Sequence, residues 1–147
     1  MHEGAKIVSG GNLADSYLSD IRVVEVADEQ AEYCGRLLAG LGADVVKVEP
    51  PGGGPTRRIG PFYEDMPGPE RSLFFWQYNL GKRSVVLDLE TAGGRERFVG
   101  LVGTADVLLE STPRGELDRL GLGADSLMRQ SPSLIVARVS AFGDHGP

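Results

Sequence analysis

Apolar residues along this chain follow two spacings, and each spacing predicts a different element. Between residues 21 and 27 nearly every second position is apolar, and most are β-branched, which predicts a strand. From 31 to 41 apolar side chains recur every three or four residues, which predicts a helix, and Gly42 stands where a left-handed residue ends one. A second strand, Asp44–Glu49, then stops at two prolines, which have no N–H to give to a ladder.

The helix before Gly42 carries one apolar face. Its members are Ala31, Cys34, Leu37, Leu38 and Leu41. We expect this face to pack in the core, with Cys34 as a buried thiol and not a nucleophile. Asp28 is expected to cap the start of the helix, because its carboxylate can accept hydrogen bonds from first-turn N–H groups.

The same alternation resumes after a long loop, residues 50–71, that is rich in glycine and proline. Ser72 can cap an aromatic helix at 73–78, whose rings we expect in the core, and Thr91 can cap a helix that runs to about Gly103. The other expected elements are strands at 84–89, 106–110 and 134–140 and short helices at 116–120 and 124–130.

Short apolar strands that alternate with helices predict an α/β fold, a Rossmann-like and mainly parallel sheet with helices on both faces. Parallel strands need crossover connections, and ligands of such sheets bind beyond the carboxyl ends of the strands. Residues 1–17 have weak periodicity and are interpreted as a flexible tail, and residues 18–147 as one domain.

The net charge of −6 argues against a nucleic-acid or membrane-surface protein, because no basic field exists. No apolar run approaches the roughly 20 residues that span a bilayer, and the first residues lack the apolar core of a signal peptide. The one cysteine has no disulfide partner, and no Cys/His spacing predicts a zinc site. We therefore expect a cytoplasmic protein with no metal.

A dinucleotide site is the first ligand site to test in such a fold. Residues 27–32 follow the first strand, contain no glycine and carry three carboxylates, so they cannot cradle a pyrophosphate. Gly40 and Gly42 close a helix instead of opening one. The sequence therefore disfavours NAD or FAD.

Six segments, in order along the chain, are similar to those of family III CoA-transferases, the CaiB/BaiF group, which also includes α-methylacyl-CoA racemases. They are Gly42-Ala-Asp-Val-Val-Lys-Val-Glu-Pro-Pro-Gly52, Gly60-Pro-Phe62, Asn79-Leu-Gly-Lys-Arg-Ser-Val-Val-Leu-Asp-Leu89, Ala105-Asp-Val-Leu-Leu-Glu110, Leu117-Asp-Arg-Leu-Gly-Leu-Gly123 and Ser140-Ala-Phe-Gly-Asp-His-Gly-Pro147. The resemblance implies the first part of a CoA-binding, Rossmann-like large domain. Full-length members are longer and form interlocked homodimers.

The resemblance assigns CoA phosphate contacts to Lys82 and Arg119, and charge-assisted donors are what phosphates need. Arg57 and Arg58, in the loop after a strand, could also reach a phosphate. Arg114 lies one position away from the family's usual arginine and is a further candidate. No nicotinamide, flavin or metal is implied, only CoA or an acyl-CoA as substrate.

Two other features bear on the chemistry. Gln30-Ala-Glu-Tyr33 replaces the Ala-Gly-Pro that many relatives have after the first strand. The family's nucleophilic aspartate, or the His-Asp pair of its racemases, follows the Phe-Gly…Gly-Pro segment, and neither Asp144 nor His145 matches it. We interpret both as loop residues.

The sequence thus predicts the CoA-binding part of an enzyme that moves CoA from an acyl-CoA to a carboxylate acceptor. The resemblance implies that a carboxylate outside this chain attacks the thioester, giving an acyl-enzyme anhydride and then an enzyme-bound CoA thioester. The chain itself then carries no catalytic residue. The alternatives are a non-catalytic CoA- or nucleotide-binding module and a fragment of an α-methylacyl-CoA racemase.

Overall fold

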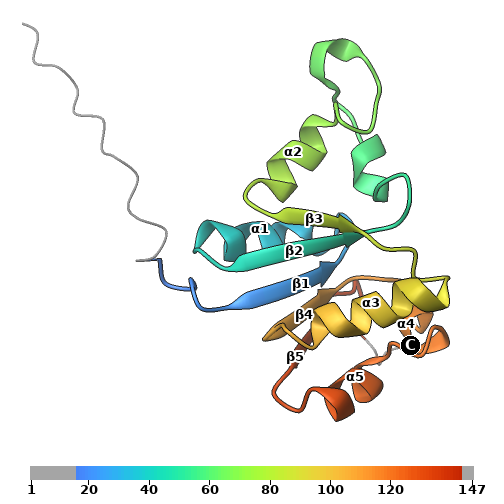
Figure 1. The fold of residues 1–147 in the computed structure, drawn as a ribbon. Helices are drawn as coiled ribbons and strands as arrows, with labels where there is room; N and C mark the ends of the chain where they lie inside the picture. The colour runs from blue at the N-terminus through green and yellow to red at the C-terminus, as the bar shows by residue number, and fades with distance from the viewer. Residues whose placement is uncertain (1–15, 144–147) are drawn as a thin grey trace, which may run out of the picture.

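A five-stranded parallel sheet forms the centre of the chain in a computed structural model that describes residues 16–143 (Figure 1). Its strands lie in the order β3-β2-β1-β4-β5. Their bounds are Arg22–Val26 (β1), Asp44–Glu49 (β2), Arg83–Val86 (β3), Val107–Glu110 (β4) and Ile135–Arg138 (β5). Each neighbouring pair is parallel, which confirms the α/β prediction.

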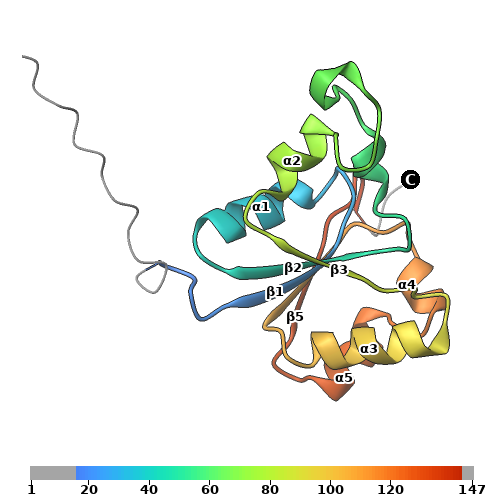
Figure 2. The same ribbon diagram turned by 45° about the horizontal axis from the view of Figure 1, so that its top comes forward.

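Helices cover both faces of the sheet, as Figures 1 and 2 show from two directions. The helices α1 and α2 lie on one face, and α3, α4 and α5 lie on the other. Their bounds are Glu32–Gly40 (α1), Leu73–Asn79 (α2), Ala92–Val102 (α3), Glu116–Arg119 (α4) and Ala124–Gln130 (α5). The expected 1–17 tail falls mostly outside the described residues and stays a prediction.

The direction of strand order reverses between β1 and β4, which are neighbours in the sheet although α1, β2, α2, β3 and α3 separate them in sequence. Val26 at the end of β1 stands beside Glu110 at the end of β4. In parallel sheets the two connections that leave such a pair turn to opposite faces and open a crevice between them. The fold therefore predicts a ligand site at the carboxyl ends of β1 and β4.

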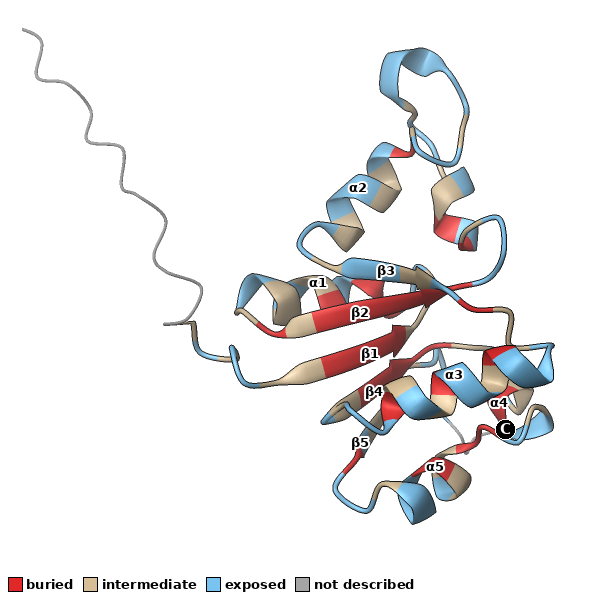
Figure 3. Cartoon of the chain, viewed as in Figure 1, coloured by how far each residue is buried: buried red, intermediate tan, exposed pale blue. Residues whose placement is uncertain are grey.

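The two faces of the sheet are buried by different kinds of side chain. The α3 and α5 side is apolar, and Phe98, Val102 and Leu127 pack there against strand residues such as Val24 and Leu108. The α1 side is partly ionic, because Glu25, Lys47 and Glu49 are nearly inaccessible to solvent. Figure 3 shows how thoroughly the central strands are buried compared with β3.

The end of α1 confirms the predicted role of Gly42. Its φ is +102°, and the N–H of Gly42 donates to the carbonyl of Ala39 while the N–H of Ala43 donates to that of Leu38. This pair of bonds is the Schellman arrangement, which satisfies the last carbonyls of a helix and needs a left-handed residue. A glycine is the residue with the least strain there.

Gly42→Val should lower the free energy of unfolding by about 1 kcal/mol or more, because a β-branched residue is strained at positive φ. A Cβ at this position would also collide with the side chain of Ser16. Urea unfolding followed by circular dichroism would measure the change. Gly40→Val is the matched control, since Gly40 lies inside the helix with no positive φ, and an equal loss in both variants would contradict the proposed terminator role.

The predicted apolar face of α1 is correct only in part: Ala31 is buried and Leu38 packs partly buried against the core, but its other members face solvent. Cys34, Leu37 and Leu41 are exposed, and the face that meets the sheet is offset from them and contains Ala31, Glu32 and Gly35. Glu32 turns inward because a buried lysine on β2 supplies its partner. Cys34 is therefore a surface thiol and not a core residue.

Two other local predictions are wrong. The N-cap of α1 is Ala31, without a side-chain cap, and Asp28 instead accepts a hydrogen bond from the N–H of Gln30, two residues on. No residue of α2 is buried, and its aromatic side chains are half-buried or, at Trp76, exposed, although Ser72 does cap that helix as expected. The 50–71 loop also contains two short 3₁₀ turns, Pro55–Arg58 and Tyr63–Asp65, that periodicity did not predict.

Candidate functional site

A cavity of about 380 Å³ opens at the carboxyl ends of the first four strands. Its apolar lining comes from the ends of β1 and β2, from the segment after β3 and from α4. The lining residues are Val26, Ala27, Asp28, Val48, Glu49, Pro50, Pro55, Leu87, Asp88, Leu89, Glu90, Ser111, Thr112, Pro113, Glu116, Leu117 and Leu120. The cavity thus lies where the fold predicts a ligand.

The polar groups of this lining are acceptors or hydroxyls, and none of the lining residues is Lys, Arg or His. Asp28 and Ser111 meet at the crevice between β1 and β4, where the Ser111 hydroxyl donates to Asp28 Oδ1 at 2.6 Å and the N–H of Asp28 donates to Ser111 Oγ at 3.0 Å. The interior therefore suits a ligand group that donates hydrogen bonds, and a phosphate would meet negative charge there.

Glu49, at the end of β2, accepts four hydrogen bonds from three residues. Arg57 Nε and Nη2 donate to its two oxygens at 2.6 and 2.8 Å, and the Ser84 hydroxyl and the Gly54 N–H also donate to it. Burial acts to raise the pKa of Glu49, but these hydrogen bonds outweigh it and lower the pKa to about 2. The Glu49 carboxylate is therefore ionised and fully engaged.

Arg57 is fixed on its other sides as well. Its guanidinium lies 3.8 Å from the centre of the Phe75 ring and pairs with Glu70 at 2.9 Å. Cation–π stacking and a two-pronged carboxylate pair are both arrangements that Arg favours. Arg57 therefore ties the loop after β2 to α2.

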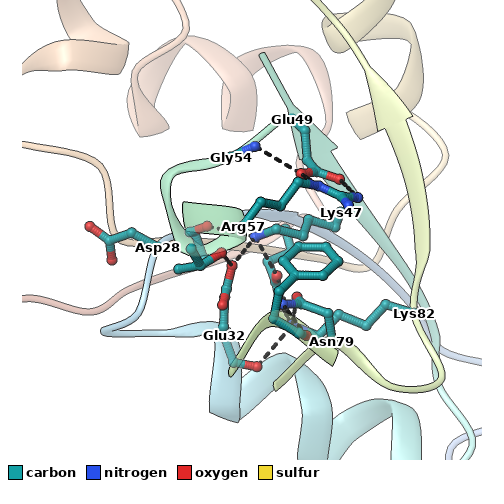
Figure 4. Close-up of polar contacts among 12 residues, drawn as sticks. Asp28, Glu32, Lys47, Glu49, Gly54, Arg57, Asn79 and Lys82 are labelled. Carbon is teal, nitrogen blue, oxygen red and sulfur yellow. Dashed lines mark hydrogen bonds and ion pairs between the residues drawn. The ribbon is translucent and has the colours of Figure 1, made fainter. Parts of the chain in front are cut away.

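A second ionic cluster lies deeper under α1 (Figure 4). We call Glu25, Glu32, Lys47 and Lys82 the buried tetrad; all four side chains are at most 2% exposed. Lys47 Nζ lies 2.7 Å from Glu32 and 3.3 Å from Glu25, and it donates to the carbonyl of Ala27. Two carboxylates face two ammonium groups, so the tetrad has no net charge.

Lys82 reaches the tetrad from the turn before β3. Its ammonium lies 2.8 Å from both oxygens of Glu25, 2.8 Å from the carbonyl of Glu32 and 2.9 Å from Asn79 Oδ1. Burial raises the pKa of Glu25, although the charges of Lys47 and Lys82 act to lower it. Burial likewise lowers the pKa of Lys82, although the charge of Glu25 acts to raise it. The ion pair thus joins β1, α1 and the β3 turn.

Arg119 stands beside the cavity at the end of α4. Its Nη2 and Nη1 donate to the two oxygens of Glu90, at 2.5 and 3.3 Å, and Glu90 itself lines the cavity. Hydrogen bonds from Arg119 lower the pKa of Glu90. Both side chains are more than half exposed, so this pair is open to a ligand.

The five basic residues singled out from the sequence lie in different surroundings. Arg119 is paired with Glu90 beside the cavity, Arg57 is bound to Glu49, and Lys82 is inside the tetrad. Arg58 is exposed and donates to backbone carbonyls of its own loop, and Arg114 is exposed in the loop after β4. Their assignment to CoA phosphates stays a prediction.

The structure also brings forward residues that sequence reasoning missed. Glu90, Asp28 and Ser111 all line the cavity, and each follows the end of a strand. Their position just after a strand end was the one signal in the sequence that they could belong to a ligand site. That signal could not show which of the many loop residues come together at the cavity. Asp144 and His145 lie outside the described residues.

Between residues 16 and 143, no group of three or more His, Cys, Asp or Glu residues is placed to hold a metal ion. In the same part of the chain, no helix combines the length and apolarity needed to cross a membrane.

The parallel sheet and its reversed strand order define a domain of the doubly wound α/β class, and the cavity at the strand ends is its candidate ligand site. A sequence profile described as CoA-transferase family III matches residues 18–147. The chain belongs to that family.

Curated relatives carry the names of several CoA-transferases. Succinyl-CoA:(R)-benzylsuccinate CoA-transferase subunit BbsE of Thauera aromatica is 45% identical over 129 residues, covering 88% of this chain and 32% of the relative. Succinyl-CoA:mesaconate CoA-transferase of Haloarcula hispanica is 41% identical over 128 residues, covering 86% of this chain and 32% of the relative. The chain thus spans about a third of the length of these relatives.

Solved structures show the same fold. The crystal structure of a CAIB/BAIF family protein from Brucella suis superposes with a TM-score of 0.80 at 40% sequence identity, over 90% of this chain and 35% of that one. That of a hypothetical protein, Rv3272, from Mycobacterium tuberculosis gives a TM-score of 0.79 at 37% identity, over 90% and 35% of the two chains.

Proposed function

We propose that this chain binds CoA or an acyl-CoA in the cavity at the strand ends and forms part of an acyl-CoA:carboxylate CoA-transferase. The observation that carries the proposal is the position of the cavity, which opens at the reversal of strand order and whose lining residue Glu90 pairs with the exposed Arg119. Membership of the family makes CoA the ligand to test first.

The chemistry of the cavity suggests how CoA would lie. The acceptor groups of Asp28 and Ser111 suit the amine and hydroxyl donors of adenosine or the amide N–H groups of pantetheine, and the apolar walls suit the rest of those groups. The phosphates would stay at the mouth, where Arg119 offers two N–H donors. Arg58 and Arg114 are exposed and remain candidates for a second phosphate.

The nucleophile is proposed to lie outside this chain. Glu49 and Glu110 end two strands near the cavity, but Glu49 is bound by Arg57, and Glu110 pairs with Arg138 and accepts from Thr112. A carboxylate held in this way is a poor nucleophile, because attack on a thioester would break its ion pair. We therefore assign binding and orientation to this chain, within the homodimer that the resemblance implies for full-length members.

Isothermal titration calorimetry with CoA tests the proposal. We expect binding that weakens as salt rises, because phosphate contacts are largely ionic, and Arg119→Ala should weaken it roughly tenfold. Arg129→Ala is the matched control, since Arg129 is exposed on α5 and does not line the cavity.

Two results would count against this function. One is the absence of CoA binding at millimolar concentration. The other is an equal loss of affinity in the Arg119 and Arg129 variants, which would mean that only the overall charge of the chain matters.

A further inference from the structure

Glu90 forms an ion pair with Arg119, the arginine that the proposed CoA site would offer to a phosphate. It follows β3, lines the cavity, and places its two carboxylate oxygens against the two terminal nitrogens of Arg119. These are the same N–H groups, in the same two-pronged arrangement, that a phosphate would use. A phosphate and Glu90 therefore cannot both hold Arg119 in this way.

We propose that Glu90 is an internal competitor for the ligand phosphate and sets the strength and selectivity of phosphate binding at this site. The inference rests on the proposed function and adds a residue that determines specificity. In the free protein Glu90 neutralises Arg119, and a CoA phosphate gains the arginine only by displacing that carboxylate.

The displacement requires movement of one side chain only. Arg95 Nη1 donates to the carbonyls of Leu89 and Glu90, at 3.0 and 2.8 Å, so the backbone beside the cavity is held in place. The side chains of Glu90 and Arg119 are 63% and 58% exposed. Ion pairs this exposed contribute little to stability, so Glu90 can turn to solvent when a stronger anion arrives.

The Glu90 carboxylate also repels any anion that approaches the cavity. Asp28, Glu49, Asp88 and Glu116 also line this cavity, so a displaced Glu90 adds a further carboxylate to an acidic surface near the phosphate. Negative charges that line one cavity lie close enough to repel a phosphate, and salt screens this repulsion only in part. The site should therefore accept a phosphate less readily than its arginine suggests, and should discriminate against ligands with more phosphate charge.

Glu90→Gln tests the inference by removing the charge and keeping the shape. We expect Glu90→Gln to bind CoA about two- to fivefold more tightly than the unmodified chain, with the same melting temperature. Glu96→Gln is the matched control: it removes the same charge from an exposed position on α3 outside the cavity and should leave CoA affinity unchanged.

The double variant Glu90→Gln/Arg119→Ala shows whether the effect passes through Arg119. If Glu90 acts mainly by occupying Arg119, most of the gain seen in Glu90→Gln is lost when the double variant is compared with Arg119→Ala, and only the smaller part that comes from charge repulsion remains. Dephospho-CoA, which lacks the 3′-phosphate, identifies the phosphate involved. A gain with CoA alone assigns the 3′-phosphate, and an equal gain with both ligands assigns the pyrophosphate; either supports the inference.

Three results would overturn it. Unchanged CoA affinity in Glu90→Gln, with binding otherwise intact, rejects the competitor role and leaves the proposed function standing. A gain that survives at full size in the double variant, relative to Arg119→Ala, or that Glu96→Gln reproduces, means that Glu90 acts only through its charge and not by occupying Arg119. No CoA binding by the unmodified chain and Glu90→Gln alike removes the proposed function and this inference together.

Discussion

Lys82→Met should lower the free energy of unfolding by about 3–5 kcal/mol, the usual loss when one partner of a buried ion pair is removed. The methionine fills a similar volume but leaves the Glu25 carboxylate, which is 0% exposed, without its two 2.8 Å contacts. Within residues 16–143, Lys47 then remains as the one cation that contacts the Glu25 carboxylate, at 3.3 Å. Urea unfolding monitored by circular dichroism would measure the loss.

Arg83→Met is the matched control, because it removes a neighbouring cation from an exposed pair. The Arg83 side chain is 63% exposed in its contact with Asp44, so the loss should stay below about 1 kcal/mol. Equal stability of Lys82→Met and the unmodified chain would contradict a structural role for Lys82. A stable Lys82→Met variant that no longer binds CoA would instead support the phosphate contact predicted from the sequence.

Gly35→Ala is expected to destabilise the chain by about 3 kcal/mol, although alanine is normally the better helix former. A Cβ on Gly35 would overlap Oε2 of Glu25 and come within 3.2 Å of Lys82 Cε. The carboxylate cannot move aside cheaply, because two lysines hold it. Helix α1 must therefore approach the sheet through a residue with no side chain, and thermal or urea unfolding would show the loss.

Gly100→Ala provides the comparison for Gly35→Ala. Gly100 lies inside α3, and a Cβ there would meet nothing within 4 Å. Alanine should then stabilise by about 0.5–1 kcal/mol, the ordinary helical effect. The same sign of change in both variants would contradict the proposed contact between α1 and the tetrad.

The element order could be predicted from the sequence because local signals were strong. Gly42 and the prolines after Glu49 fix where elements end, the N-caps Ser72 and Thr91 fix where helices begin, and these signals act within a few residues of the chain. The parallel sheet followed from alternation of strands and helices. The strand order did not, since it depends on contacts between distant segments.

The site was harder to predict, because its charges pair across long separations. Lys82 meets Glu25 across 57 residues, and Arg119 meets Glu90 across 29. A basic residue that matches a phosphate-binding pattern can satisfy its charge within the chain, and the sequence does not reveal the partner. The face of α1 was partly misjudged for the same reason, since the buried Glu32 finds its partners in Lys47 and in the Thr56 hydroxyl, both distant in sequence.

The buried tetrad gives the two sides of the sheet opposite responses to temperature. The apolar side, around Phe98, weakens on cooling, because the hydrophobic driving force fades. The ionic side strengthens relative to it on heating, because the hydration that charged groups give up becomes less favourable as temperature rises. Exposure of polar surface also lowers the heat capacity of unfolding. We therefore expect the free energy of unfolding of this chain to change less steeply with temperature than that of an equally large domain with two apolar layers.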